Sequence, residues 1–157
     1  MATETWQLNS TERETLAKER CEFLFQHVKQ SGGAPQRTKS ETTILVPSKE
    51  HIFSVSISPK DPRHITVSLA YSAPPAESKK AIEAAQLASQ STIVSKVRIE
   101  PKSDQLLFSV EASFFNEDNA DLARTFGLYL AAILDTYERF VDELANERVH
   151  TRIGMRT

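Results

Sequence analysis

Apolar side chains near the start of the chain recur at the spacing of an amphipathic helix. The repeating set consists of Leu16, Phe23, Leu24, His27 and Val28. Asn9 or Thr11 can cap this helix, and Thr11 with Glu14 has the spacing of a capping box. Two glycines, Gly32 and Gly33, follow and are typical of a helix end. We therefore predict a helix from about Thr11 to the glycine pair.

Three runs then alternate apolar and polar residues, which predicts strands with one buried face. They cover residues 42–46, 51–57 and 64–71. If the last two form a hairpin, its buried face pairs Phe53 with Leu69, Val55 with Val67 and Ile57 with Ile65. Ile44 is then expected inward beside Phe53, while Leu45 and Ile52 face outward.

An alanine-rich stretch over residues 76–91 predicts a second helix that can approach its neighbour closely. One face carries Ala81, Ala85 and Ala88 beside Ile82. Two interpretations stay open at this point. The face packs on the sheet of its own chain, or it is shared across a subunit interface.

Two more strands are predicted over residues 92–100 and 105–114, joined by a polar turn. The alternation turns four residues inward, with Val97 opposite Phe108 and Ile99 opposite Leu106. The outward positions are Val94, Lys96, Arg98, Leu107, Ser109 and Glu111. Val94 and Leu107 are therefore apolar residues on the open face of the sheet.

A long final helix is predicted from Asp118 or Asn119 to about Asn146. At about 100 degrees per residue its apolar residues form two neighbouring ridges. The first contains Leu122, Phe126, Tyr129, Ile133, Tyr137, Phe140 and Leu144, and the second contains Ala123, Gly127, Leu130, Leu134 and Val141. Because one sheet cannot cover both ridges, the second must meet the first helix, another subunit or a client protein.

The predicted fold class is α+β, in the order α-β-β-β-α-β-β-α. It has a five-stranded, mainly antiparallel sheet with helices packed on one face. We expect one chaperone-like domain over residues 1–146 and a polar, flexible tail over residues 147–157. Arg148, Arg152 and Arg156 recur every four residues in that tail and would align only if the last helix continued into it.

Composition narrows the class of protein. The chain has 157 residues, 39% of them hydrophobic, and a net charge of -2, which fits one soluble domain without the basic surface of a nucleic-acid-binding protein. Cys21 is the single cysteine, so no internal disulfide can form. The N-terminus does not resemble a secretory signal, and the longest apolar stretch, Phe126 to Leu134, is too short to span a bilayer. We expect a cytoplasmic protein that does not bind membranes.

The side chains that could take part in catalysis or metal binding do not form a recognisable site. His51 and His64 fall at opposite ends of the predicted hairpin, too far apart to ligate one metal ion. Acidic residues near 117–121 are typical of a helix N-terminus. Cys21 lies within an amphipathic helix, as a small apolar side chain would. Neither a phosphate-binding glycine pattern nor the Gly-x-Ser-x-Gly motif of a nucleophilic serine is present. We expect no catalytic residue, metal or cofactor.

The second half of the chain resembles the type III secretion chaperone-like fold, and in particular the YbjN-like family of proposed bacterial sensory transduction regulators. The resemblance lies in a short helix ending near Ser91, strands over 93–99 and 106–112, and a long helix from Asn119 with Phe140 near its end. It implies a small cytoplasmic homodimer that binds other polypeptides and catalyses nothing. It supplies no active-site residues.

These observations lead to a non-enzymatic protein-binding module, a small chaperone or regulatory adaptor that buries apolar segments of a partner or of a secreted effector-like polypeptide. The candidate contacts are Leu45, Ile52, Val94 and Leu107 on the sheet and Ile82 and Ala85 on the second helix. One alternative is a small-ligand sensor or enzyme with a pocket between the long helix and the sheet. Another is a structural subunit of a larger assembly.

Overall fold

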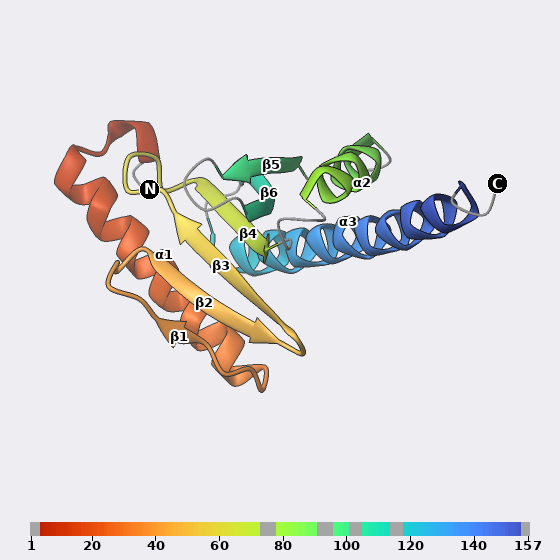
Figure 1. Cartoon of the computed structure of the whole chain (residues 1–157). Helices are drawn as coiled ribbons and strands as arrows, with labels where there is room; N and C mark the ends of the chain where they lie inside the picture. Colours follow the sequence, from red (N-terminus) through yellow and green to blue (C-terminus); the bar gives the residue numbers. More distant parts are fainter. Residues whose placement is uncertain (1–3, 73–77, 91–95, 101–104, 114–117, 155–157) are drawn as a thin grey trace. The chain divides into compact units, whose positions relative to one another are not determined.

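The computed structural model describes residues 4–72, 78–90, 96–100, 105–113 and 118–154 (Figure 1). Its helical elements are η1 (Thr5–Gln7), α1 (Ser10–Gln30), α2 (Ser78–Gln90) and α3 (Asn119–Gly154). Its strands are β1 (Gln36–Arg37), β2 (Thr43–Ser48), β3 (His51–Ile57), β4 (His64–Ser72), β5 (Lys96–Glu100) and β6 (Gln105–Ser113). The predicted α+β class and the order of helices and strands are confirmed.

The strands are ordered β1-β2-β3-β4-β6-β5 in one sheet. Five of them are the predicted strands, and β1 is an additional strand of two residues at one edge. The chain also divides into two compact units. Unit 1 comprises Met1–Leu69 and Glu111–Leu128, and unit 2 comprises Ala70–Val110 and Tyr129–Thr157. The single domain over residues 1–146 stays a prediction.

Helix α1 of unit 1 is capped two residues before its predicted capping box. The Asn9 side chain accepts a hydrogen bond from the Glu12 amide at 2.9 Å, and the Glu12 carboxylate accepts one from the Asn9 amide at 2.9 Å. Asn9 is therefore the cap, and the box uses Glu12 in place of the predicted Thr11 and Glu14. The helix ends before Gly32, whose positive φ of 88° suits a residue without a side chain.

The predicted register of the β3–β4 hairpin is confirmed, with Phe53 opposite Leu69 at its centre. The prediction for β2 was wrong by two residues, because Val46 and not Ile44 pairs with Phe53. Ile44 pairs with Val55 and still faces inward, since a shift of two residues keeps a side chain on the same face. Figure 1 shows α1 lying along β2 and β3, where it buries Ala17, Cys21, Leu24 and Val28.

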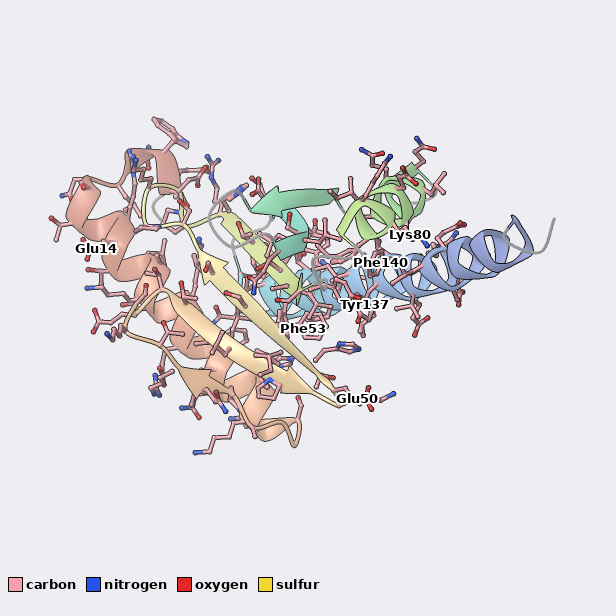
Figure 2. All side chains as sticks on the ribbon, in the orientation of Figure 1. Glu14, Glu50, Phe53, Lys80, Tyr137 and Phe140 are labelled. Carbon is pink, nitrogen blue, oxygen red and sulfur yellow. The ribbon has the colours of Figure 1, made fainter. Side chains whose placement is uncertain are left out.

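Unit 2 is held by aromatic rings and by alanines. Tyr71 and Phe108 contact Tyr137 and Phe140 of α3, with ring centroids between 4.9 and 6.3 Å apart. Figure 2 shows the labelled Tyr137 and Phe140 close together on α3. The α2 face formed by Ala81, Ala84, Ala85 and Ala88 is buried. Contacts between α2 and β5 support the interpretation that this face packs within its own chain.

The β5–β6 register is confirmed, with Val97 opposite Phe108 and Ile99 opposite Leu106. Ser109 was predicted to face outward but is buried, because β6 is an inner strand and a serine side chain is short enough to be covered by its neighbours. Helix α3 also extends to Gly154, eight residues beyond the predicted end at Asn146. Arg148 and Arg152 therefore lie in the helix, and Arg156 lies outside the described residues.

Candidate functional site

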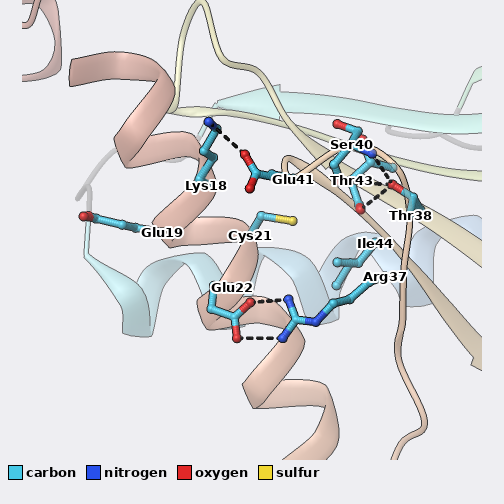
Figure 3. Close-up of a pocket in the computed structure, with 10 residues that line it drawn as sticks. All are labelled: Lys18, Glu19, Cys21, Glu22, Arg37, Thr38, Ser40, Glu41, Thr43 and Ile44. Carbon is cyan, nitrogen blue, oxygen red and sulfur yellow. Dashed lines mark hydrogen bonds and ion pairs between the residues drawn. The ribbon is translucent and has the colours of Figure 1, made fainter. Parts of the chain in front are cut away.

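A groove of about 540 Å³ lies between α1 and the chain segment that carries β1 and the start of β2 (Figure 3). We call it the α1 groove. Its walls are charged and polar, and its floor is formed by buried apolar side chains. Its lining residues are Lys18, Glu19, Cys21, Glu22, Arg37, Thr38, Ser40, Glu41, Thr43 and Ile44.

One end of the groove is closed by a two-point ion pair between Glu22 of α1 and Arg37 of β1. The Arg37 guanidinium donates to both carboxylate oxygens, at 2.5 and 3.0 Å, and lies 4.0 Å from the centre of the Phe25 ring. The hydrogen bonds from Arg37, followed by one from Gln26, hold the pKa of Glu22 at about 2, below its ordinary value of 4.5. This pair attaches the edge strand to the helix.

The other side of the groove is bridged by Lys18. Its ammonium contacts the Glu41 carboxylate at 2.8 Å and the Glu14 carboxylate at 3.1 Å. The hydrogen bond to Glu41, and next the one to Glu14, raise the pKa of Lys18 above its ordinary value. The lysine is therefore a fixed cation with two partners and does not serve as a proton acceptor near neutral pH.

Cys21 lies at the base of the groove and points from α1 toward the strand segment (Figure 3). Its side chain is 2% exposed. Burial, aided by the nearby Glu22 carboxylate, raises the pKa of the thiol to about 11. Because the thiolate is the nucleophile, a thiol with this pKa is unreactive near neutral pH. The groove therefore has the chemistry of a contact surface with fixed charges.

Sequence reasoning did not find this groove. Arg37 and Glu22 are 15 residues apart and belong to no periodic pattern, so neither predicted the other. The only signal was the glycine pair after α1, which lets the chain fold back along the helix. Thr38 then fixes the returning segment, because its hydroxyl lies 2.9 Å from the Thr43 carbonyl oxygen and 3.0 Å from that of Ser40.

The two histidines considered as a metal pair are placed as predicted. His51 begins β3, and His64 begins β4 beside Ser58, whose amide donates to the His64 carbonyl at 3.0 Å. No group of three or more histidine, cysteine, aspartate or glutamate side chains gathers at metal-binding distance in the part of the chain that the structure describes. In that part, no helix combines the length and the apolar character needed to cross a membrane.

The predicted contact residues differ in how exposed their side chains are. Ile52 is 56% exposed, and Leu45 is half-buried diagonally from it on the same face of the β2–β3 pair. Ile82 and Leu107, both in unit 2, are half-buried. Ala85 is 2% exposed, because α2 buries its alanine face within unit 2, and its assignment to a contact surface stays a prediction. Val94 lies outside the described residues.

The second apolar ridge of α3 is a further surface that the site prediction left out. In unit 2 the first ridge is largely buried, with Ile133 and Phe140 at 0% exposure and its two tyrosines half-buried. The second ridge stays open along the same helix, where Leu130 and Leu134 are half-buried and Val141 is 44% exposed. We call Leu130, Leu134 and Val141 the open ridge. The sequence contained this signal, because the apolar arc of the helix is wider than one packing partner covers.

No family model matches the chain, and no match was found among curated protein sequences. Among solved structures, YbjN from E. coli is similar over 83% of this chain and 92% of its own, with 11% sequence identity and a TM-score of 0.54. A chain of the ExoT-SpcS complex from Pseudomonas aeruginosa matches over 74% of this chain and 93% of its own, with 14% identity and a TM-score of 0.49. The fold expected from the resemblance is confirmed: this chain has the fold of YbjN.

Proposed function

We propose that this protein is a non-enzymatic protein-binding module, acting as a small chaperone or regulatory adaptor. One observation carries the proposal: the open ridge of α3 leaves apolar side chains in contact with solvent beside a ridge of the same helix that is largely buried. Covering Leu130, Leu134 and Val141 would contribute several kcal/mol, at about 25 cal/mol per Å² of apolar area, before the ordering costs of association. That range suits a reversible complex.

The proposed partner is an apolar segment of another polypeptide, such as a secreted effector-like chain, or a second copy in a homodimer. Ile52 with Leu45 offers a second apolar contact, in unit 1. The proposal includes no catalytic step, in keeping with the α1 groove, where the cations are paired and the thiol is protonated. The fold shared with YbjN is compatible with this role and does not itself assign it.

The test is Val141→Asp, compared with Asn146→Asp. Val141 belongs to the open ridge, whereas Asn146 is exposed on another side of the same helix, so both variants add one negative charge to an exposed position. Sedimentation velocity measures self-association, and affinity purification from the native cell with mass spectrometry identifies retained proteins. We expect Val141→Asp to lose at least about tenfold in affinity for the second copy or the partner, while Asn146→Asp binds as the wild type does.

Circular dichroism serves as the folding control, and both variants should keep the helix and strand content of the wild type. Equal binding by both variants would remove the open ridge from the proposal. A saturable, stoichiometric thermal shift with a metabolite, nucleotide or metal, without any protein partner, would favour the ligand-sensor alternative instead.

A further inference from the structure

The corner of unit 1 where η1, the first turn of α1 and the β3–β4 turn meet contains a cationic pocket. A cavity of about 150 Å³ is lined by Thr5, Trp6, Arg13, Lys60, Asp61 and Arg63. A second cavity of about 310 Å³, which also uses Arg13 and Lys60, adjoins it. The smaller cavity therefore has three cations against one carboxylate, on a chain whose net charge is -2.

Two of the three cationic groups, Arg13 and Arg63, are oriented by hydrogen bonds. The Arg13 Nε donates to the Leu8 carbonyl at 3.0 Å, which leaves the two terminal nitrogens of the guanidinium without a hydrogen bond or ion pair in the described part of the chain. Lys60, which is exposed, likewise forms neither kind of contact there. Arg63 is oriented by Asp61 through bonds of 3.0 and 3.2 Å.

The turn that carries Lys60 is fastened to α1. Arg20 is 6% exposed, and its guanidinium donates to the Pro62 carbonyl at 2.6 Å. Within the turn, the Ser58 hydroxyl accepts from the Asp61 amide at 3.2 Å. These bonds fix where Lys60 leaves the backbone, so its ammonium needs little reorganisation to reach a ligand beside Arg13.

Trp6 adds a flat apolar surface to this cationic corner. Its side chain is 65% exposed, so its ring is accessible to a ligand in the cavity that it lines. An aromatic ring beside guanidinium and ammonium groups suits a ligand with an anionic group next to an apolar or aromatic part. The smaller cavity, of about 150 Å³, has room for one oxyanion group.

We infer that this pocket binds a single oxyanion group, a phosphate monoester or a carboxylate, with an adjoining apolar moiety placed over Trp6. Arg13 and Lys60 supply the charge-assisted hydrogen bonds, and Arg63 adds positive potential from its place on Asp61. The group can belong to a free small molecule or to an acidic or phosphorylated side chain of a polypeptide. The site shares no residue with the open ridge, so the inference does not depend on the proposed function.

The chain has its own reporter, because Trp6 is the single tryptophan. Its fluorescence is followed while the full chain is titrated with inorganic phosphate, with phenyl phosphate and with the blocked dipeptide Phe-Glu. We expect saturable changes, tighter binding of phenyl phosphate than of inorganic phosphate because of the ring over Trp6, and weaker binding at 0.5 M salt. Preference for phenyl phosphate or for the dipeptide distinguishes a phosphate source from a carboxylate source, and either result supports the site.

Lys60→Gln should weaken binding about tenfold, the loss expected for one charge-assisted hydrogen bond. Lys29→Gln is the matched control, because it removes the same charge from an exposed position at the far end of α1, and it should bind as the wild type does. Arg13→Gln, with circular dichroism to verify its folding, provides a second test of the pocket. Equal affinities for Lys60→Gln and the wild type, no saturable response to any probe, or a response to a single-stranded oligonucleotide alone would overturn the inference.

Discussion

The two units of this chain hold their long helices by different means. In unit 1, α1 covers a strand face of β-branched and aliphatic side chains and is tied to its neighbours by ion pairs, of which the Arg37–Glu22 pair reaches the edge strand. In unit 2, α3 is held through Tyr137 and Phe140, which contact the rings of Tyr71 and Phe108. Unit 1 should therefore respond to changes in charge as well as to changes in side-chain volume, whereas in unit 2 side-chain volume should dominate.

The largest expected effect comes from removing one phenyl ring from each unit. Phe53 in unit 1 and Phe140 in unit 2 are both 0% exposed, so Phe53→Ala and Phe140→Ala delete the same group from equally buried positions. Each should cost about 3–5 kcal/mol of unfolding free energy, because the lost ring leaves a cavity. Urea unfolding followed by circular dichroism measures the loss.

The same pair of variants shows whether the units open separately. The Cys21 thiol in unit 1 is buried, so its rate of reaction with a thiol reagent at pH 8 reports opening of that unit. If the units are independent, Phe53→Ala should accelerate labelling at least about a hundredfold, and Phe140→Ala should leave it unchanged. Equal acceleration in both variants would instead demonstrate one cooperative domain over residues 1–146.

A smaller effect is expected from overfilling the alanine face of α2. Ala85→Leu inserts a branched side chain where the wild type is 2% exposed and should destabilise the protein by about 1–3 kcal/mol. Gln86→Leu places the same leucine side chain at the exposed neighbouring position, where it is not confined, and should leave the unfolding midpoint unchanged. If Ala85→Leu dissociated a dimer without changing the melting temperature of the monomer, the face would belong to a subunit interface.

The strands could be predicted in register because alternation and turn chemistry act together. Phe53 and Leu69 both lie on apolar faces, and a slip by one residue would turn the whole set to the other face, so alternation selects the face and the turn between the strands selects the register. The two-residue strand β1 has no such alternation. Its position depends on the ion pair of Arg37 with Glu22, a contact that local sequence patterns do not encode.

The site was predictable only where exposure follows from the face of a strand or helix. Ile52 was assigned outward by alternation, and the structure leaves it exposed. Ala85 was assigned to a contact surface although it is buried in the single chain, because an alanine stripe has the same sequence pattern whether it meets its own sheet or another subunit. The end of α3 was missed because residues 147–153 contain neither glycine nor proline, so nothing in the sequence stops the helix before Gly154.

The smallest expected effect tests the role of charge in unit 1. Because the pKa of Glu22 is about 2 in the folded protein and 4.5 ordinarily, its pairing with Arg37 stabilises the fold above about pH 4.5, and this contribution is lost as the pH falls toward 2. The lowered pKa values of Glu41 and Asp61, caused first by hydrogen bonds from Lys18 and Arg63, act in the same direction. Acid should therefore weaken unit 1.

Glu22→Gln should reduce the unfolding free energy at pH 7 by less than about 1 kcal/mol, because the Glu22 side chain is 45% exposed and solvent screens the pair. The variant should also lose less stability than the wild type between pH 5 and about pH 2, since it has no carboxylate to protonate at this position.

Glu19→Gln is the control, because Glu19 lines the same groove without an ion pair in the described part of the chain, and it should keep the wild-type pH profile. Urea midpoints across this pH range, with hydrogen exchange to assign the loss to β2 and β3, measure both effects. An unchanged pH profile in Glu22→Gln would show that the pair holds the edge strand in place without contributing to stability, and that acid sensitivity does not distinguish the units.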